Sequence, residues 1–78
     1  MNRDEVMALV ASVLARIAPE AELAGVGDSE DLRAALDLDS MDFLNLIIGL
    51  SKGSGQDIPE KDYPRLFTLQ GIVSYLAQ

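Results

Sequence analysis

Apolar side chains recur every three or four residues in three stretches of the chain, which is the spacing of an amphipathic α-helix. The first stretch runs from about Arg3 to Ala18. Asn2 and Glu5 stand at its start with the spacing of a capping box, and Pro19 stops the helix because residues before proline avoid the α region. One face of this predicted helix collects Val6, Val10, Val13, Leu14 and Ile17.

A second helix is predicted from Asp39-Ser40 to about Lys52, and it has two apolar surfaces. One face, expected in the core, holds Phe43, Leu46, Ile47 and Leu50. The outer half holds a second apolar group, Met41, Leu44 and Ile48. The remaining residues of that outer half are Asp42, Asn45, Gly49 and Lys52. The run from Ser51 to Gly55 is typical of a helix end followed by a flexible loop.

The last main helix is predicted to begin after Thr68, a favourable N-cap residue. Its apolar face follows helical spacing through Leu69, Ile72, Val73 and Leu76. Before it, Ile58 to Tyr63 predicts a short helix with a proline in its first turn, and Pro64 is expected to prevent its extension.

A long acidic connection from Pro19 to Asp39 joins the first two helices. We expect Leu32, Leu36 and Leu38 to anchor this loop in the core, and residues 29–32 allow one short helical turn. The alternation over residues 36–39 has the period of a strand, but aspartate is depleted in strands and no other segment could pair with it. The pattern therefore predicts an all-α, four-helix bundle with three main helices, one short helix and a long first loop.

The amino-acid composition excludes several classes of function and adds little to the prediction of the fold. Residues 1–78 suffice for a single domain. Thirteen carboxylates against six basic side chains give a net charge of −7, which disfavours nucleic acid as a partner. No apolar run approaches the roughly 20 residues of a membrane span, and the N-terminus is too acidic for a secretory signal. We therefore expect an acidic cytoplasmic protein.

Catalytic constellations are not found in the sequence. The chain has no cysteine and no histidine, so it lacks the usual nucleophile, general base and soft metal ligands. The acidic pairs Glu30-Asp31 and Asp37/Asp39 lack the loop spacing of a calcium-binding EF-hand and are interpreted as a solvated acidic loop. We expect neither an enzyme nor a metal site.

The segment Leu38-Asp39-Ser40-Met41-Asp42 resembles the attachment site of acyl carrier proteins. The resemblance extends over nearly the whole chain, including the order of helices and the acidic loop. It implies that the Ser40 hydroxyl is esterified by the phosphate of 4′-phosphopantetheine, with Asp39 in a supporting role. It also implies a phosphopantetheinyl transferase, working with magnesium at its interface with the carrier, and enzymes that load, transfer or condense acyl groups. We expect the carrier to be a monomer.

The capping and the dipole expected at this helix start also favour Ser40 as the attachment site. If Asp39 is the N-cap, its carboxylate accepts from the amide of Met41 or Asp42, and Ser40 becomes the first helical residue with a hydroxyl that need not act as a cap. A phosphodiester on Ser40 would then place negative charge at the positive end of the helix dipole. The competing interpretation is that Asp39 or Ser40 serves only as a helix cap.

The two apolar surfaces of the second helix acquire separate roles from the resemblance. Phe43, Leu46, Ile47 and Leu50 would form the core or line the acyl cleft. The predicted partner surface comprises Met41, Asp42, Leu44, Asn45 and Ile48, with core packing as the competing interpretation for its apolar members. Fatty-acid carriers have several carboxylates along this helix, whereas residues 1–39 here have a net charge of −6 and residues 40–78 only −1. This departure favours a dedicated set of partner enzymes.

Other functions stay open at this point. The cargo could be an amino acid, as in D-alanyl or peptidyl carriers, although the latter usually show a Gly-Gly-His-Ser style site. The chain could also be an unmodified helical interaction module, with Met41, Leu44 and Ile48 as the contact surface and Ser40 as a cap. Fatty-acid, lipid and polyketide pathways all fit an acyl carrier of this kind.

Overall fold

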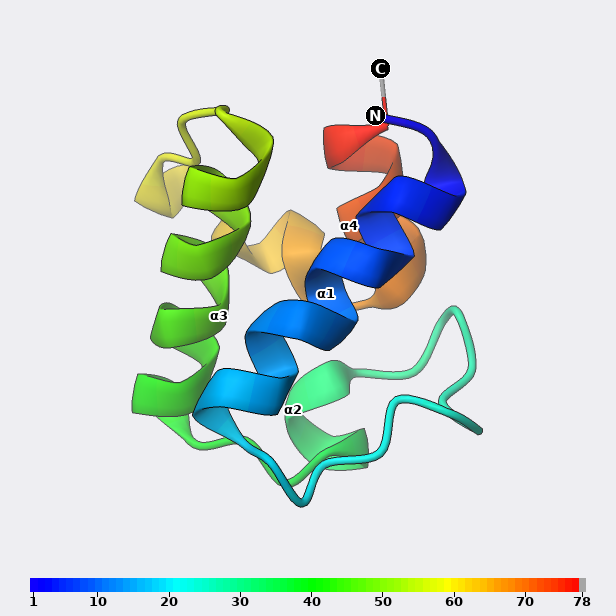
Figure 1. The fold of residues 1–78 in the computed structure, drawn as a ribbon. Coiled ribbons are helices and arrows are strands. Elements are labelled where there is room, and N and C mark those ends of the chain that lie inside the picture. The colour runs from blue at the N-terminus through cyan, green and yellow to red at the C-terminus, as the bar shows by residue number, and fades with distance from the viewer. Residues whose placement is uncertain (78) are drawn as a thin grey trace.

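In the computed structural model, which describes residues 1–77, the chain forms five helical segments joined by loops (Figure 1). They are α1 (Arg3–Ile17), α2 (Leu32–Ala35), α3 (Ser40–Ser54), the 3₁₀-helix η1 (Glu60–Leu66) and α4 (Leu69–Leu76). Residues 1–77 contain no strand. The all-α prediction is confirmed, and the short turn allowed within the first loop is present as α2.

Helix α1 begins as its sequence predicts. The Asn2 side chain accepts a hydrogen bond from the Glu5 amide at 2.8 Å, and the Glu5 carboxylate accepts one from the Asn2 amide at 3.0 Å. This reciprocal capping box satisfies two amides that the first turn would otherwise leave unpaired. The helix ends at Ile17, one residue before the predicted end, with Ala18 as its C-cap.

Helix α3 lies beside α1 and runs in the opposite direction (Figure 1). It continues to Ser54, beyond the end predicted near Lys52, and stops at Gly55, whose φ of 72° is accessible without strain to glycine. Gly49, predicted on the outer half, instead faces α1: a Cβ there would lie 2.6 Å from a methyl group of Val13. The prediction for Gly49 was wrong because helical periodicity does not reveal which face a neighbouring helix approaches.

The first loop is tied to the rest of the molecule by α2 and by backbone hydrogen bonds. Asp31 caps α2 by accepting from the Arg33 amide at 2.9 Å. The Leu32 amide donates to the Phe67 carbonyl at 2.8 Å, which joins this loop to the segment before α4. Leu32 and Leu38 are buried, and Leu36 is half-buried and packs against the same core, so all three predicted anchors are confirmed.

A tight turn connects α2 to α3 through Asp37, which has a φ of 53°. The Asp37 amide donates to the Ala34 carbonyl at 3.4 Å, and the Leu38 amide donates to the Arg33 carbonyl at 2.9 Å. This pair of bonds is the Schellman arrangement that closes the end of a helix. The turn directs Leu38 toward the core and brings Asp39 to the start of α3.

The short helix expected over residues 58–63 is the 3₁₀-helix η1, and Pro64 lies inside it. The prediction that Pro64 would prevent extension was wrong. Pro64 opens a further turn, in which the Phe67 amide donates to the Pro64 carbonyl at 3.5 Å and the missing amide proton of the proline is not needed. The Tyr75 hydroxyl donates to Asp62 at 2.7 Å, which links α4 to η1 and raises the pKa of Tyr75.

The core collects one face from each long helix. Thr68 caps α4 as predicted, by accepting from the Gly71 amide at 3.0 Å. The start of α1 and the end of α4 lie at the same end of the molecule (Figure 1). None of the helices within the described part of the chain has the length and apolar character that crossing a membrane requires. The buried side chains are Val6, Val10, Val13, Leu14, Leu32, Leu38, Phe43, Leu46, Ile47, Leu50, Leu66, Leu69, Ile72 and Leu76.

Candidate functional site

The start of α3 is held by a second capping box. The Asp39 carboxylate accepts from the Asp42 amide at 2.8 Å, and the Asp42 carboxylate accepts from the Asp39 amide at 3.4 Å. Asp39 is therefore the N-cap, and Ser40 is the first residue of the helix. The capping role predicted for Asp39 is confirmed in this geometry, with Asp42 as the donor.

Ser40 is exposed at this helix start, and within residues 1–77 its hydroxyl makes no hydrogen bond. Asp39 already supplies the side-chain cap of this helix, so Ser40 is not needed for that role. A group joined to the Ser40 oxygen would therefore break no structural hydrogen bond. The positive end of the dipole of this 15-residue helix favours negative charge at the same place.

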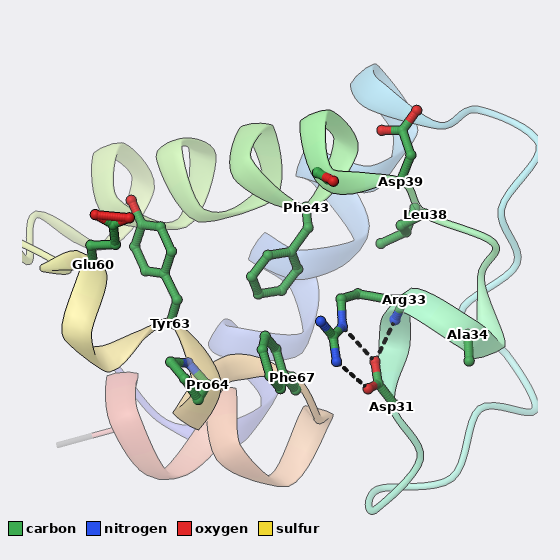
Figure 2. A pocket seen from close by; sticks show the side chains of 11 residues that line it. Asp31, Arg33, Ala34, Leu38, Asp39, Phe43, Glu60, Tyr63, Pro64 and Phe67 are labelled. Carbon is green, nitrogen blue, oxygen red and sulfur yellow. Dashed lines mark hydrogen bonds and ion pairs between the residues drawn. The ribbon is translucent and has the colours of Figure 1, made fainter.

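An open cleft of about 780 Å³ lies beside Ser40, between the start of α3, helix α2 and η1. Three aromatic side chains form much of its wall, and Figure 2 shows Phe43 projecting from α3 toward Phe67, with Tyr63 to one side. The Phe43 ring centre lies 5.3 Å from that of Phe67 and 6.5 Å from that of Tyr63, both in edge-to-face arrangement. The cleft thus offers an apolar, aromatic surface within reach of Ser40.

An ion pair that was not predicted from the sequence also lines the cleft. The Arg33 guanidinium lies 3.6 Å from the centre of the Phe67 ring and donates to both carboxylate oxygens of Asp31, at 3.1 and 2.6 Å (Figure 2). The hydrogen bond from Arg33 lowers the pKa of Asp31, and the same bond raises the pKa of Arg33. Sequence analysis had assigned Asp31 to a solvated acidic loop. An aspartate two residues before an arginine at a helix start was the available signal for the pair, but nothing in the sequence placed it in the cleft.

The predicted core face of α3 is buried as a whole, but only one of its members reaches the cleft. Phe43 both packs in the core and lines the cleft. Leu46, Ile47 and Leu50 are buried in the core and do not line this cleft.

The predicted partner surface is exposed in part. Met41 is 63% exposed and Ile48 is 42% exposed, which makes them the large apolar side chains of α3 most open to solvent. Asn45 is also exposed, whereas Leu44 and Asp42 are half-buried. Their role in binding a partner stays a prediction.

Comparison with known proteins finds relatives that resemble this chain over nearly its whole length. No protein-family model matches the chain. An acyl carrier protein of Thermosynechococcus vestitus is 29% identical over 79 residues, covering 97% of this chain and 93% of that protein. An acyl carrier protein of Rubrobacter xylanophilus is 26% identical over 83 residues, covering 100% of this chain and 95% of that protein. Both matches support the family assignment that the sequence resemblance predicts.

Proposed function

We propose that the chain is a carrier of the acyl carrier protein family and that its Ser40 bears 4′-phosphopantetheine. The observation that carries the proposal is the geometry at the start of α3: an exposed serine hydroxyl with no hydrogen bond in residues 1–77, beside an Asp39 that already caps the helix. The proposal extends to residues 1–78 acting as one carrier domain in the cytoplasm. The chain itself would not be an enzyme.

The residues around Ser40 have distinct tasks in this proposal. Asp39 fixes the first turn, so that the Ser40 oxygen projects from a rigid helix start rather than from a mobile loop. The free amides of that turn and the helix dipole favour the negative charge of a phosphodiester. When attached, the arm supplies the thiol that this cysteine-free chain lacks and on which acyl groups are carried as thioesters.

The aromatic cleft would shelter the cargo near its attachment point. Phe43 and Phe67 present apolar surface beside Ser40, and the Arg33 guanidinium, paired with Asp31, lies over the Phe67 ring. An acyl group there would lose contact with water without requiring the core to open, because the cleft already exists in the described fold. A phosphopantetheinyl transferase and enzymes that load, transfer or condense acyl groups are the proposed partners.

We test the attachment by intact-mass measurement after incubating the protein with coenzyme A, Mg²⁺ and a broad-specificity phosphopantetheinyl transferase. The expected result is the addition of one phosphopantetheine group to the native chain and none to Ser40→Ala. Ser12→Ala, which removes an exposed serine from α1, serves as the matched control and should be modified like the native chain. A folded native protein that no transferase modifies would overturn the proposal in favour of an unmodified interaction module.

The cap interpretation makes a different prediction about stability. Because Asp39 is the N-cap, Asp39→Ala should lower the free energy of unfolding by about 1 kcal/mol, whereas Ser40→Ala should change it by less than about 0.5 kcal/mol. Urea unfolding followed by circular dichroism measures both. A Ser40→Ala loss as large as that of Asp39→Ala would make Ser40 a structural residue.

The pathway is proposed to be a specialised fatty-acid, lipid or polyketide route, because α3 has few carboxylates. Asp42 is the acidic residue within Ser40–Ser54, and that stretch also holds Lys52. We expect the ketoacyl synthase of a general fatty-acid synthase to elongate the acyl form more slowly than that of a housekeeping carrier. Equal rates would contradict a dedicated set of partners, and loading by an amino-acid-adenylating enzyme would indicate an aminoacyl carrier.

A further inference from the structure

Some basic side chains of this acidic molecule interact with a partner side chain, whereas others form no ion pair in the described part of the chain. Three of the six have a partner: Arg3 pairs with Asp28, Arg33 pairs with Asp31, and Arg65 lies over the Tyr75 ring. In the part of the chain that the structure describes, the other three make no ion pair with a carboxylate: Arg16, Lys52 and Lys61.

Two of these unpaired cations converge on one groove. Arg16, from the last turn of α1, and Lys52, from the last turns of α3, line a depression of about 230 Å³ between the two helices. Ile48, 42% exposed, lies in the same groove beside Asn45. No carboxylate lines it, although the chain has a net charge of −7.

The groove lies between α1 and α3, which pack closely against each other. Gly49 of α3 presses against Val13 of α1, so the backbones approach closely and side chains on either side of the contact flank a shallow groove. Both helices are 15 residues long, so the groove belongs to the two longest elements of the fold and not to a loop. An exposed apolar side chain with cations beside it is the arrangement that a complementary protein surface would cover.

We propose that this α1/α3 groove docks a partner protein through an apolar side chain set against Ile48 and carboxylates that pair with Arg16 and Lys52. The proposal deepens the proposed carrier function and rests on it, because it names the chemistry of the enzymes that use the Ser40 end of the same helix. The partner surface is thus acidic at the groove, in contrast to the basic surfaces that meet carboxylate-rich carriers.

The ion pairs of Arg16 and Lys52 are expected to contribute more to the orientation of the bound partner than to its affinity. An exposed ion pair contributes about 0.2–1 kcal/mol, so two pairs change a dissociation constant by about twofold to thirtyfold. The wider negative field of the chain repels acidic surfaces at long range. An acidic partner is therefore held only where the two cations face it directly, which selects one docking position.

The test uses the unmodified native chain and two matched amphipathic peptides of about 18 residues, long enough to form a helix, with identical leucine faces and either glutamate or lysine rims. Binding is mapped by shifts of the backbone amide signals of the ¹⁵N-labelled protein. The expected result is that the glutamate peptide shifts the signals of Asn45, Ile48 and Lys52. Arg16→Gln/Lys52→Gln should weaken its binding by about threefold to tenfold at low salt.

Lys61→Gln is the matched control, since it removes an unpaired cation from η1, outside the groove, and should leave the affinity unchanged. Equal weakening by Lys61→Gln, preference of the groove for the lysine peptide, or no shift at the groove would each overturn the proposal. Concentration-dependent shifts at the groove without peptide would assign it to a second copy of the chain and also overturn it. Because the unmodified chain is used, the outcome is independent of whether Ser40 accepts the phosphopantetheine arm.

Discussion

Asp37 shows how a single residue sets the position of the candidate site. Its φ of 53° lies in the left-handed region, where a β-branched side chain is strongly disfavoured and glycine is free of strain. Asp37→Val should therefore lower the free energy of unfolding by about 1–2 kcal/mol, and Asp37→Gly should cause no loss. Urea unfolding of the two variants measures the difference.

Asp57→Val provides the control for that measurement, because Asp57 is also exposed but does not have a positive φ. It should change stability by less than about 0.5 kcal/mol. If Asp37→Val proved as harmless as Asp57→Val, the turn that carries Asp39 to the start of α3 would not depend on the backbone conformation of Asp37.

For single residues, the sequence predicts those interactions that involve near neighbours along the chain. The cap by Asp39 and the free hydroxyl of Ser40 follow from residues within one helical turn, and the structure has the same arrangement. The stacking of Arg33 on Phe67 joins residues 34 positions apart, so it depends on how η1 folds back toward α2. No local pattern contains that information.

At the scale of elements, the contact between α1 and α3 depends on two glycines that face different neighbours. A Cβ on Gly49 would lie 2.6 Å from a methyl group of Val13, a buried β-branched side chain with little freedom to move. A Cβ on Gly53 would instead meet the end of the half-buried, flexible Leu9 side chain. The same substitution should therefore have opposite effects at the two positions.

Gly49→Ala should lower the free energy of unfolding by about 1–2 kcal/mol, since overpacking costs up to about 3 kcal/mol and the gain in helix propensity is about 1 kcal/mol. Gly53→Ala should leave stability unchanged or raise it by up to about 1 kcal/mol. Val13→Ala should cost less in the Gly49→Ala background than in the native chain, which a double-mutant cycle measures. Equal effects of the two glycine substitutions would contradict the close approach at Gly49.

These glycines also explain where helix prediction failed. Gly53 followed by Ser54 and Gly55 is typical of a helix end, yet α3 continues through Gly53 because Leu9 packs against it. Gly55 then ends the helix with the left-handed conformation that sequence rules associate with glycine. The sequence rule correctly predicted that a glycine ends α3, but it placed the end too early. Tertiary packing decides which of the residues 53–55 ends the helix.

At the scale of the whole molecule, the charge of each half could be counted from the sequence, but its pairing could not. Residues 1–39 hold nine carboxylates and three arginines. The structure pairs Arg3 with Asp28 and Arg33 with Asp31, which leaves seven carboxylates and Arg16 in that half without an ion pair among the described residues. Leu32 and Leu38 hold the acidic loop against the core, although most carboxylates of this half have no ion pair to offset their mutual repulsion.

That repulsion predicts that salt stabilises the fold. Raising ionic strength from about 0.01 M to about 0.15 M shortens the Debye length from about 30 Å to about 8 Å. We expect the melting temperature to rise by roughly 4–8 °C, the shift that relief of about 1 kcal/mol gives in a domain of this size.

Glu20→Gln/Glu22→Gln changes the net charge from −7 to −5 and should reduce the salt effect, whereas Arg16→Gln/Lys52→Gln changes it from −7 to −9 and should enlarge it. Thermal unfolding followed by circular dichroism at the two ionic strengths measures all three proteins. A melting temperature that is independent of salt would mean that the acidic half of the chain costs the folded state nothing, and a fall with salt would mean that the ion pairs of Arg3 and Arg33 outweigh the repulsion among the unpaired carboxylates.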